Sequence, residues 1–137
     1  AKITGTNMEV LAGKHILLCE DHPLNQEITK SILEENKIIV VIAENGKCGV
    51  EAFNHSPLGY YDSILMDIRM PVMNGYEATK AIRALNRADA QTVPIIAMTA
   101  DAFAEDVQHC FDVGMNSHVS KPMDPDKLFA ELIHFCK

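Results

Sequence analysis

Five polar residues stand directly behind short runs of the chain, where they could form a chemical site. They are Glu20 and Asp21 after residues 16–19, Asp67 after 64–66, Thr99 after 93–98 and Lys121 after 118–120. If three carboxylates lie close together, the pKa of at least one rises unless a cation neutralises the group. An all-oxygen set with few protein ligands suits Mg²⁺, or Mn²⁺ in its place.

The chemistry that this set suits best is phosphoryl transfer. Thr99 can donate a hydrogen bond to a phosphoryl oxygen, and Lys121 can neutralise one as a point charge. Phosphoryl transfer is catalysed mainly by positioning and charge neutralisation. One of the carboxylates could itself be the nucleophile and form an aspartyl phosphate. Each residue alone is more often a helix cap or a solvated side chain, so the prediction depends on their joint occurrence at separate strand ends.

The short runs predict the strands that would position these residues. Runs 16–19, 38–43, 64–66 and 93–98 are apolar, and 118–120 is a shorter fifth. Continuous apolar runs are typical of strands buried on both faces of a parallel sheet.

Residues at helical spacing lie between these runs. Leu24, Ile28 and Ile32 recur every fourth residue in the first such stretch. Gly114 is expected to end the fourth helix in a left-handed conformation, and Asp124 with Pro125 to begin the last. The alternation predicts an α/β fold with five βα units and a doubly wound five-stranded parallel sheet. In such a sheet the ligand site lies beyond the carboxyl ends of the strands.

Length and composition limit the classes of function. The chain has 137 residues and a net charge of −7, which fits one acidic domain. The acidic balance argues against nucleic acid and anionic membranes as partners.

The four cysteines lack the spacing of a zinc site and are expected to be reduced thiols in the cytoplasm. No membrane span or signal peptide is visible. Residues 1–13 are interpreted as a linker or a cloning remnant and residues 14–137 as the domain.

Taken in order, four motifs resemble the receiver domain of response regulators in two-component signalling, over residues 14–137. They are Ile16-Leu17-Leu18-Cys19-Glu20-Asp21, Leu65-Met66-Asp67-Ile68-Arg69-Met70-Pro71 with Asn74-Gly75, Ala97-Met98-Thr99-Ala100 and Ser120-Lys121-Pro122. The resemblance implies a flavodoxin-like fold with strand order 2-1-3-4-5.

The resemblance also implies a role for each site residue. Asp67 would be the phosphoacceptor. Mg²⁺ would be held by Glu20, Asp21, Asp67 and the backbone carbonyl of Arg69. Thr99 and Lys121 would bind the phosphoryl group, with Thr99 as the switch hydroxyl. The Lys121–Pro122 peptide bond is expected to be cis.

Two positions depart from the common pattern of the family. Glu20 stands where many members have aspartate, and its extra methylene is expected still to allow metal contact, directly or through water. His118 stands at the switch position, where tyrosine or phenylalanine is usual. Imidazole is smaller and titrates near neutrality. The alternative for His118 is a half-buried strand residue without a switching role.

Further features resemble receiver domains of hybrid sensor histidine kinases, among them the segment Glu20-Asp21-His22-Pro23-Leu24-Asn25-Gln26. This resemblance implies a sensor histidine kinase, in the same chain or another, and an HPt phosphotransfer domain as partners. It implies a monomeric cytoplasmic domain without nucleic-acid or direct membrane contact. Such a domain catalyses only its own phosphorylation and dephosphorylation, whereas the parent chain could be a phosphotransferase.

Three other functions stay open at this point. A stand-alone single-domain response regulator would act by protein–protein contact alone. A Mg²⁺-dependent phosphatase with an aspartate nucleophile, of the haloacid dehalogenase type, needs a second aspartate where this chain has Arg69. A flavodoxin-like FMN protein needs a phosphate-binding loop where Glu20 and Asp21 would repel phosphate.

Overall fold

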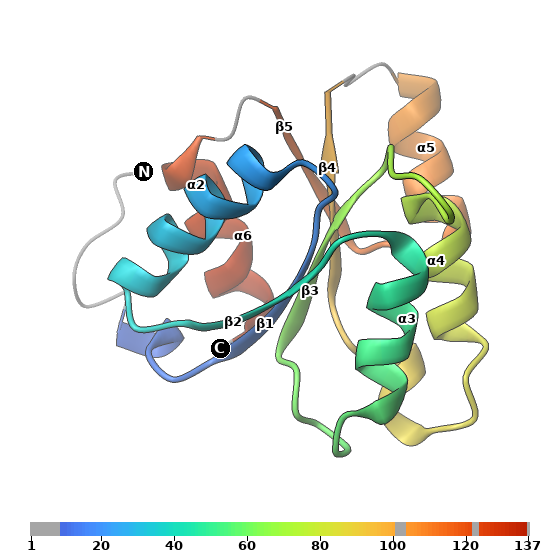
Figure 1. Cartoon of the computed structure of the whole chain (residues 1–137), viewed down its shortest axis with the longest axis horizontal. Coiled ribbons are helices and arrows are strands. Elements are labelled where there is room, and N and C mark those ends of the chain that lie inside the picture. Colours follow the sequence, from blue (N-terminus) through green and yellow to red (C-terminus); the bar gives the residue numbers. More distant parts are fainter. Residues whose placement is uncertain (1–8, 101–103, 122–123, 137) are drawn as a thin grey trace.

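The computed structural model describes residues 9–100, 104–121 and 124–136, with the backbone alone for residues 104–106 (Figure 1). The strands are β1 (His15–Cys19), β2 (Ile39–Ala43), β3 (Ser63–Asp67), β4 (Ile95–Thr99) and β5 (Ser117–Ser120). The helices are α2 (Pro23–Glu35), α3 (Gly46–His55), α4 (Gly75–Arg83), α5 (Ala104–Val113) and α6 (Pro125–Cys136), with short 3₁₀ turns η1 (Glu9–Leu11) and η2 (Ala88–Gln91). Each predicted strand is present, with bounds that differ by one or two residues.

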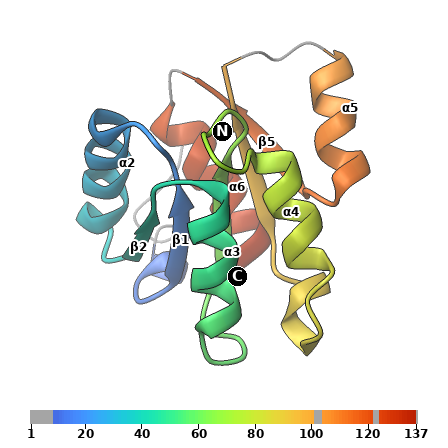
Figure 2. The same cartoon turned by 45° about the vertical axis from the view of Figure 1, so that its right-hand side comes forward.

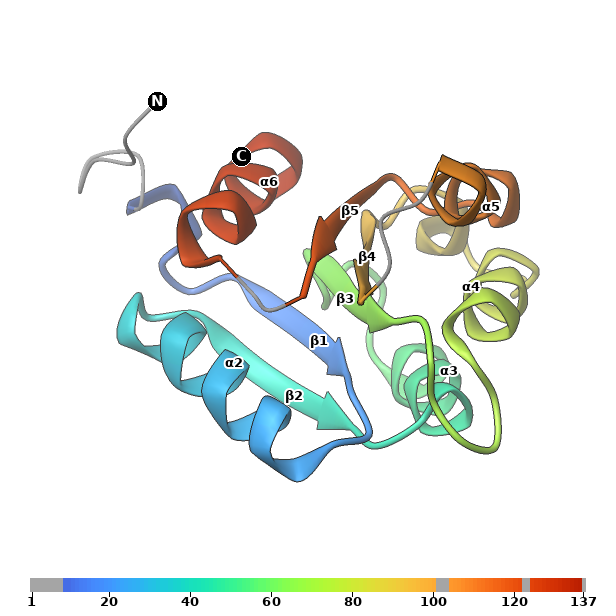
Figure 3. The ribbon, with the colours of Figure 1, turned by 90° about the horizontal axis from the view of Figure 1, so that it is seen from above.

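The five strands form one parallel sheet in the order β2-β1-β3-β4-β5, which confirms the predicted topology. The register brings the strand ends level with one another. Cys19 lies opposite Met66, Asp67 opposite Met98, and Thr99 opposite Ser120. The residues that follow each strand therefore reach the same edge of the sheet, which Figure 3 shows from above.

Helices cover both faces of the sheet, and each face has its own core. Figures 1 and 2 show α2 and α6 on one face and α3, α4 and α5 on the other. Successive strand residues point to opposite faces, so Leu17 and Cys19 belong to one core while Ile16 and Leu18 belong to the other. This double burial explains why the strands are continuously apolar in sequence.

The buried face of α2 differs from the one that the spacing indicates. Leu24 and Ile28 are 56% and 47% exposed, whereas Thr29 and Leu33 are buried. One residue corresponds to a rotation of about 100° around a helix. The four-residue spacing thus identified the helix, but the helix turns the neighbouring stripe toward the sheet and leaves Leu24 and Ile28 on the surface.

The predicted helix ends agree with the structure. Gly114 has a φ of 110° directly after α5, and α6 begins at Pro125, with the Asp124 carboxylate accepting a hydrogen bond from the Asp126 N–H (3.0 Å). At α4, Asn74 and Glu77 form a reciprocal capping box.

The segment before Lys14, interpreted from sequence as a linker, contributes one residue to the core. Leu11 of η1 is fully buried, in the same core as Leu128 and Leu132 of α6. The Gly13 N–H also donates to the Lys37 carbonyl (2.8 Å). Residues 9–13 therefore pack on the described part of the domain.

Candidate functional site

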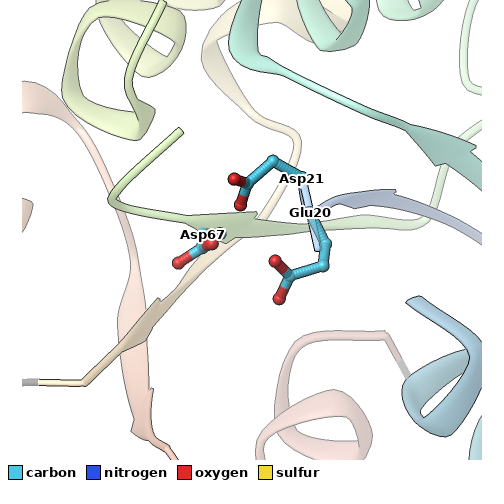
Figure 4. A group of neighbouring side chains, drawn as sticks. All are labelled: Glu20, Asp21 and Asp67. Carbon is cyan, nitrogen blue, oxygen red and sulfur yellow. The ribbon is translucent and has the colours of Figure 1, made fainter. Parts of the chain in front are cut away.

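Three carboxylates converge at the carboxyl edge of the sheet. Glu20 and Asp21 follow β1, and Asp67 is the last residue of β3; Figure 4 shows their side chains turned toward one another. Each offers one oxygen, and these oxygens lie within 4.8 Å of each other. Glu20 and Asp67 are buried, whereas Asp21 is exposed. The structure thus brings together the three acids that the strand ends indicated.

Lys121 connects two of the carboxylates. Its Nζ lies 3.0 Å from Glu20 Oε1 and 3.1 Å from Asp67 Oδ1. Burial alone would lower the pKa of the lysine, but its hydrogen bonds and its attraction to the two carboxylates raise it. One cation therefore faces three anionic groups, and the site has excess negative charge.

Backbone and side-chain donors from the start of α2 fix Glu20. The His22 N–H donates to Glu20 Oε2 (3.1 Å), and Gln26 Nε2 donates to the Glu20 carbonyl (2.7 Å). Burial would raise the pKa of Glu20, yet the hydrogen bonds from the His22 N–H and Lys121, together with the charge of Lys121, hold it below its usual value. No role for His22 or Gln26 is predicted from the sequence. Their position in the turn between β1 and α2 was the available signal.

Asp67 has the opposite pKa shift. Burial first, and the nearby charge of Glu20 second, raise the pKa of Asp67 from 3.8 to about 6, although Lys121 opposes the shift. The repulsion expected among the three carboxylates therefore acts on Asp67 and contributes to its raised pKa. A positive charge placed beside the Asp67 carboxylate would stabilise its ionised form.

The remaining predicted residues surround the same edge. Thr99 is buried at the end of β4, and Arg69 is exposed two residues after Asp67. A hollow of about 210 Å³ is lined by the three acids, Arg69, Thr99 and Lys121, together with His22, Asn25, Ile68 and Ala100.

His118 is not among the residues that line this hollow. It is half-buried on β5, opposite Ala97 of β4. Pro122 is outside the described residues, so the cis peptide bond after Lys121 stays a prediction.

The loop after β3 depends on a glycine. The Gly75 N–H donates to the Ile68 carbonyl (2.8 Å), and a Cβ at Gly75 would collide with the carbonyl oxygen of Asp67. Earlier in the loop, Val72 has a φ of 69°, and the Met73 N–H donates to the Pro71 carbonyl (2.7 Å). This tight turn leads the chain past Asp67 and into α4.

The donor set fits a hard divalent cation. All three side chains offer carboxylate oxygens, the ligands that Mg²⁺ prefers, and the exposed Asp21 leaves a side open to water. A cation there would also reduce the repulsion that raises the pKa of Asp67.

Comparison with known proteins gives one consistent result. Residues 16–133 match the family described as "Response regulator receiver domain". The chain is 36% identical over 140 residues to a hybrid signal transduction histidine kinase of Dictyostelium discoideum and 30% identical over 165 residues to histidine kinase 1 of Arabidopsis thaliana. These matches cover 99% and 98% of this chain but only 8% and 14% of the relatives.

Solved structures show the same likeness. The receiver domain of a sensor histidine kinase from Pseudomonas aeruginosa, with a magnesium ion coordinated in its active-site cleft, is 38% identical with a TM-score of 0.82, covering 91% of this chain and 98% of that one. A Saccharomyces cerevisiae receiver domain, crystallised with a histidine phosphotransfer signalling protein, is 28% identical with a TM-score of 0.81, covering 92% and 90%. Across the described part of this chain, no helix has the length and apolar character needed to cross a membrane.

Proposed function

The chain belongs to the family of response regulator receiver domains, and from this premise we propose that Asp67 accepts a phosphoryl group from a phosphohistidine. The observation that carries the proposal is the position of Asp67. It is buried at the end of β3, with Lys121 at 3.1 Å and two further carboxylates beside it. Glu20 is also buried and contacts Lys121 at 3.0 Å, but its other carboxylate oxygen accepts a hydrogen bond from the His22 N–H.

The transfer uses groups that the site already holds. A carboxylate oxygen of Asp67 forms the new P–O bond while the P–N bond of the donor breaks and its imidazole nitrogen keeps the electron pair. Lys121 stands where it can neutralise a phosphoryl oxygen, and the Thr99 hydroxyl can donate to another. We assign the cation ligands to Asp21, Asp67 and the Arg69 carbonyl, with Glu20 contributing directly or through water. Bound Mg²⁺, or Mn²⁺ in its place, would supply charge neutralisation at the transferring group.

The test is phosphorylation by a small donor. With Mg²⁺ and acetyl phosphate, intact-mass spectrometry should show a gain of one phosphoryl group, which hydroxylamine removes because an acyl phosphate is labile to it. Asp67→Asn should show no gain. A phosphoryl group that persists in Asp67→Asn would assign the acceptor elsewhere, and no gain in the unsubstituted chain would reject the function.

We further propose that the partner in transfer is an HPt domain that docks on α2. Leu24 and Ile28 are exposed, and a hollow of about 280 Å³ beside Ile28 is also lined by Glu20 and Lys121 of the site. An apolar patch that adjoins a buried phosphoacceptor can hold a protein donor in position. The complex between a related receiver domain and a histidine phosphotransfer protein supports the choice of an HPt domain as the partner.

This docking surface is tested by comparing two donors. Leu24→Ala with Ile28→Ala should slow phosphorylation by a phosphorylated HPt domain at least about tenfold, the effect of 1.4 kcal/mol. Phosphorylation by acetyl phosphate should be unchanged. Leu58→Ala is the matched control, because Leu58 is 67% exposed and lines none of the hollows around the site. Equal slowing with both donors would place the defect in the site and reject the surface.

A further inference from the structure

In the part of the chain that the structure describes, the outer edge of β2 is apolar and has no covering strand. β2 is the end strand of the sheet, and among the residues described no strand pairs with its outer side. All residues from Ile38 to Ala43 are apolar, without charge or proline, and Ile39 is 46% exposed. Proteins usually protect such an edge with lysine, proline, a bulge or a cover, because its free N–H and C=O groups can pair with another strand.

The backbone of β2 shows which groups face outward. The Ile39 N–H donates to the Lys14 carbonyl, and the Ala43 carbonyl accepts from the Glu20 N–H, so Ile39 and Ala43 face β1. Alternate residues of a parallel strand present their N–H and C=O groups to opposite sides. Val40 and Ile42 therefore direct theirs to the outer edge.

The carboxyl end of β2 borders a groove between two helices. Figure 3 shows α2 and α3 on opposite faces beside β2. A groove of about 330 Å³ lies there, lined by Gln26 of α2, Cys48 and Ala52 of α3, and Ile42, Ala43 and Glu44 at the end of the strand. A strand placed about 4.8 Å from β2 would continue the sheet between the two helices.

We propose that β2 pairs antiparallel with β2 of a second copy of this chain, about a two-fold axis at Val41 that is perpendicular to the sheet. Val40 of each copy then lies opposite Ile42 of the other, and the two residues exchange N–H···O bonds. Such an axis keeps the side chains of both strands on matching faces, so apolar residues meet apolar residues. The sheet becomes continuous across the dimer.

Charge complementarity favours a second copy as the occupant. Lys37 precedes the strand and Glu44 follows it; both are exposed, and neither forms an ion pair with another described residue. Antiparallel pairing places Lys37 of one copy at the same end as Glu44 of the other, twice per dimer.

Two short strands offer few hydrogen bonds, so the dimer forms at high concentration and the monomer prevails on dilution. The pairing requires no phosphorylation and is independent of the proposed function.

The first experiment measures mass and amide exchange together. Sedimentation equilibrium should show a rise from 15.2 kDa toward twice that mass with concentration. Over the same series, hydrogen exchange should slow at the Val40 and Ile42 amides but not at Val41, whose N–H already faces β1. A mass that stays at the monomer value up to millimolar concentration would overturn the proposal. So would a dimer without added protection at Val40 and Ile42.

Variants then test the geometry. Val40→Pro removes an outward N–H without removing a β1–β2 hydrogen bond and should abolish the dimer, whereas Val40→Ile should keep it. Lys37→Glu should weaken dimerisation at least severalfold, and Lys37→Glu with Glu44→Lys should restore it. Because both charged residues are exposed, these variants keep the fold. Failure of the double variant to recover association would reject antiparallel pairing.

Discussion

Replacing Asp67 by asparagine should stabilise the fold, although it removes the proposed phosphoacceptor. Burial and the charge of Glu20 raise the pKa of Asp67 from 3.8 to about 6, so the folded state binds a proton more tightly than the unfolded state does. Ionisation of Asp67 therefore destabilises the fold. This penalty is absent below about pH 4, grows between pH 4 and 6, and is complete above pH 6. At 1.36 kcal/mol per pKa unit, it reaches about 3 kcal/mol.

The assay is urea unfolding followed by circular dichroism in EDTA, at about pH 4 and about pH 8. Asp67→Asn should raise the free energy of unfolding by up to about 3 kcal/mol at the higher pH and by little at the lower. Asp112→Asn, at an exposed carboxylate on α5, is the control. Adding Mg²⁺ should stabilise the unsubstituted chain by mass action and leave Asp67→Asn nearly unchanged. A stability difference that does not depend on pH, or a destabilised Asp67→Asn, would refute the reasoning.

Three further substitutions test packing at the site and elsewhere in the domain by urea unfolding. Gly75→Ala should cost about 1–3 kcal/mol, because its Cβ would meet the Asp67 carbonyl; an unchanged midpoint would show that the loop can move aside. Arg83→Met should cost about 3 kcal/mol, because it removes the donors to three carbonyls (Ala90, Val93 and Gly114), and a neutral result would mean that water replaces them. Leu11→Ala should cost about 3 kcal/mol and the half-exposed Val10→Ala little, whereas equal small effects would make residues 9–13 a loose linker.

The order of the elements and the identity of the site could be predicted from the sequence. Continuous apolar runs can be buried on both faces only in a parallel sheet covered by helices. In such a sheet all carboxyl ends share one edge. The strand order 2-1-3-4-5, which the family resemblance implies, then makes the strands that carry Glu20, Asp21, Asp67, Thr99 and Lys121 neighbours. The prediction of the elements depends on periodicity, which is a local property of the chain, whereas the strand order came from the resemblance.

The helix face and the partners of each site residue could not be predicted in this way. The spacing of Leu24 and Ile28 indicated a helix, but the docking of α2 on the sheet decided that Thr29 and Leu33 are buried. Similarly, the burial of Leu11 depends on α6, which is more than a hundred residues away in the chain.

The sequence by itself determined that three acids, a hydroxyl and a lysine lie at one sheet edge, since each ends or follows a predicted strand and the carboxyl ends of parallel strands share an edge. Only the tertiary structure decided that the pKa values of Glu20 and Asp67 shift in opposite directions. Glu20 is held by Lys121 and the His22 N–H and has a lowered pKa, while Asp67 is buried beside that charge and has a raised one. The physical reason is that pKa values depend on distances of a few ångströms and on burial, and both are set by packing between segments far apart in the chain.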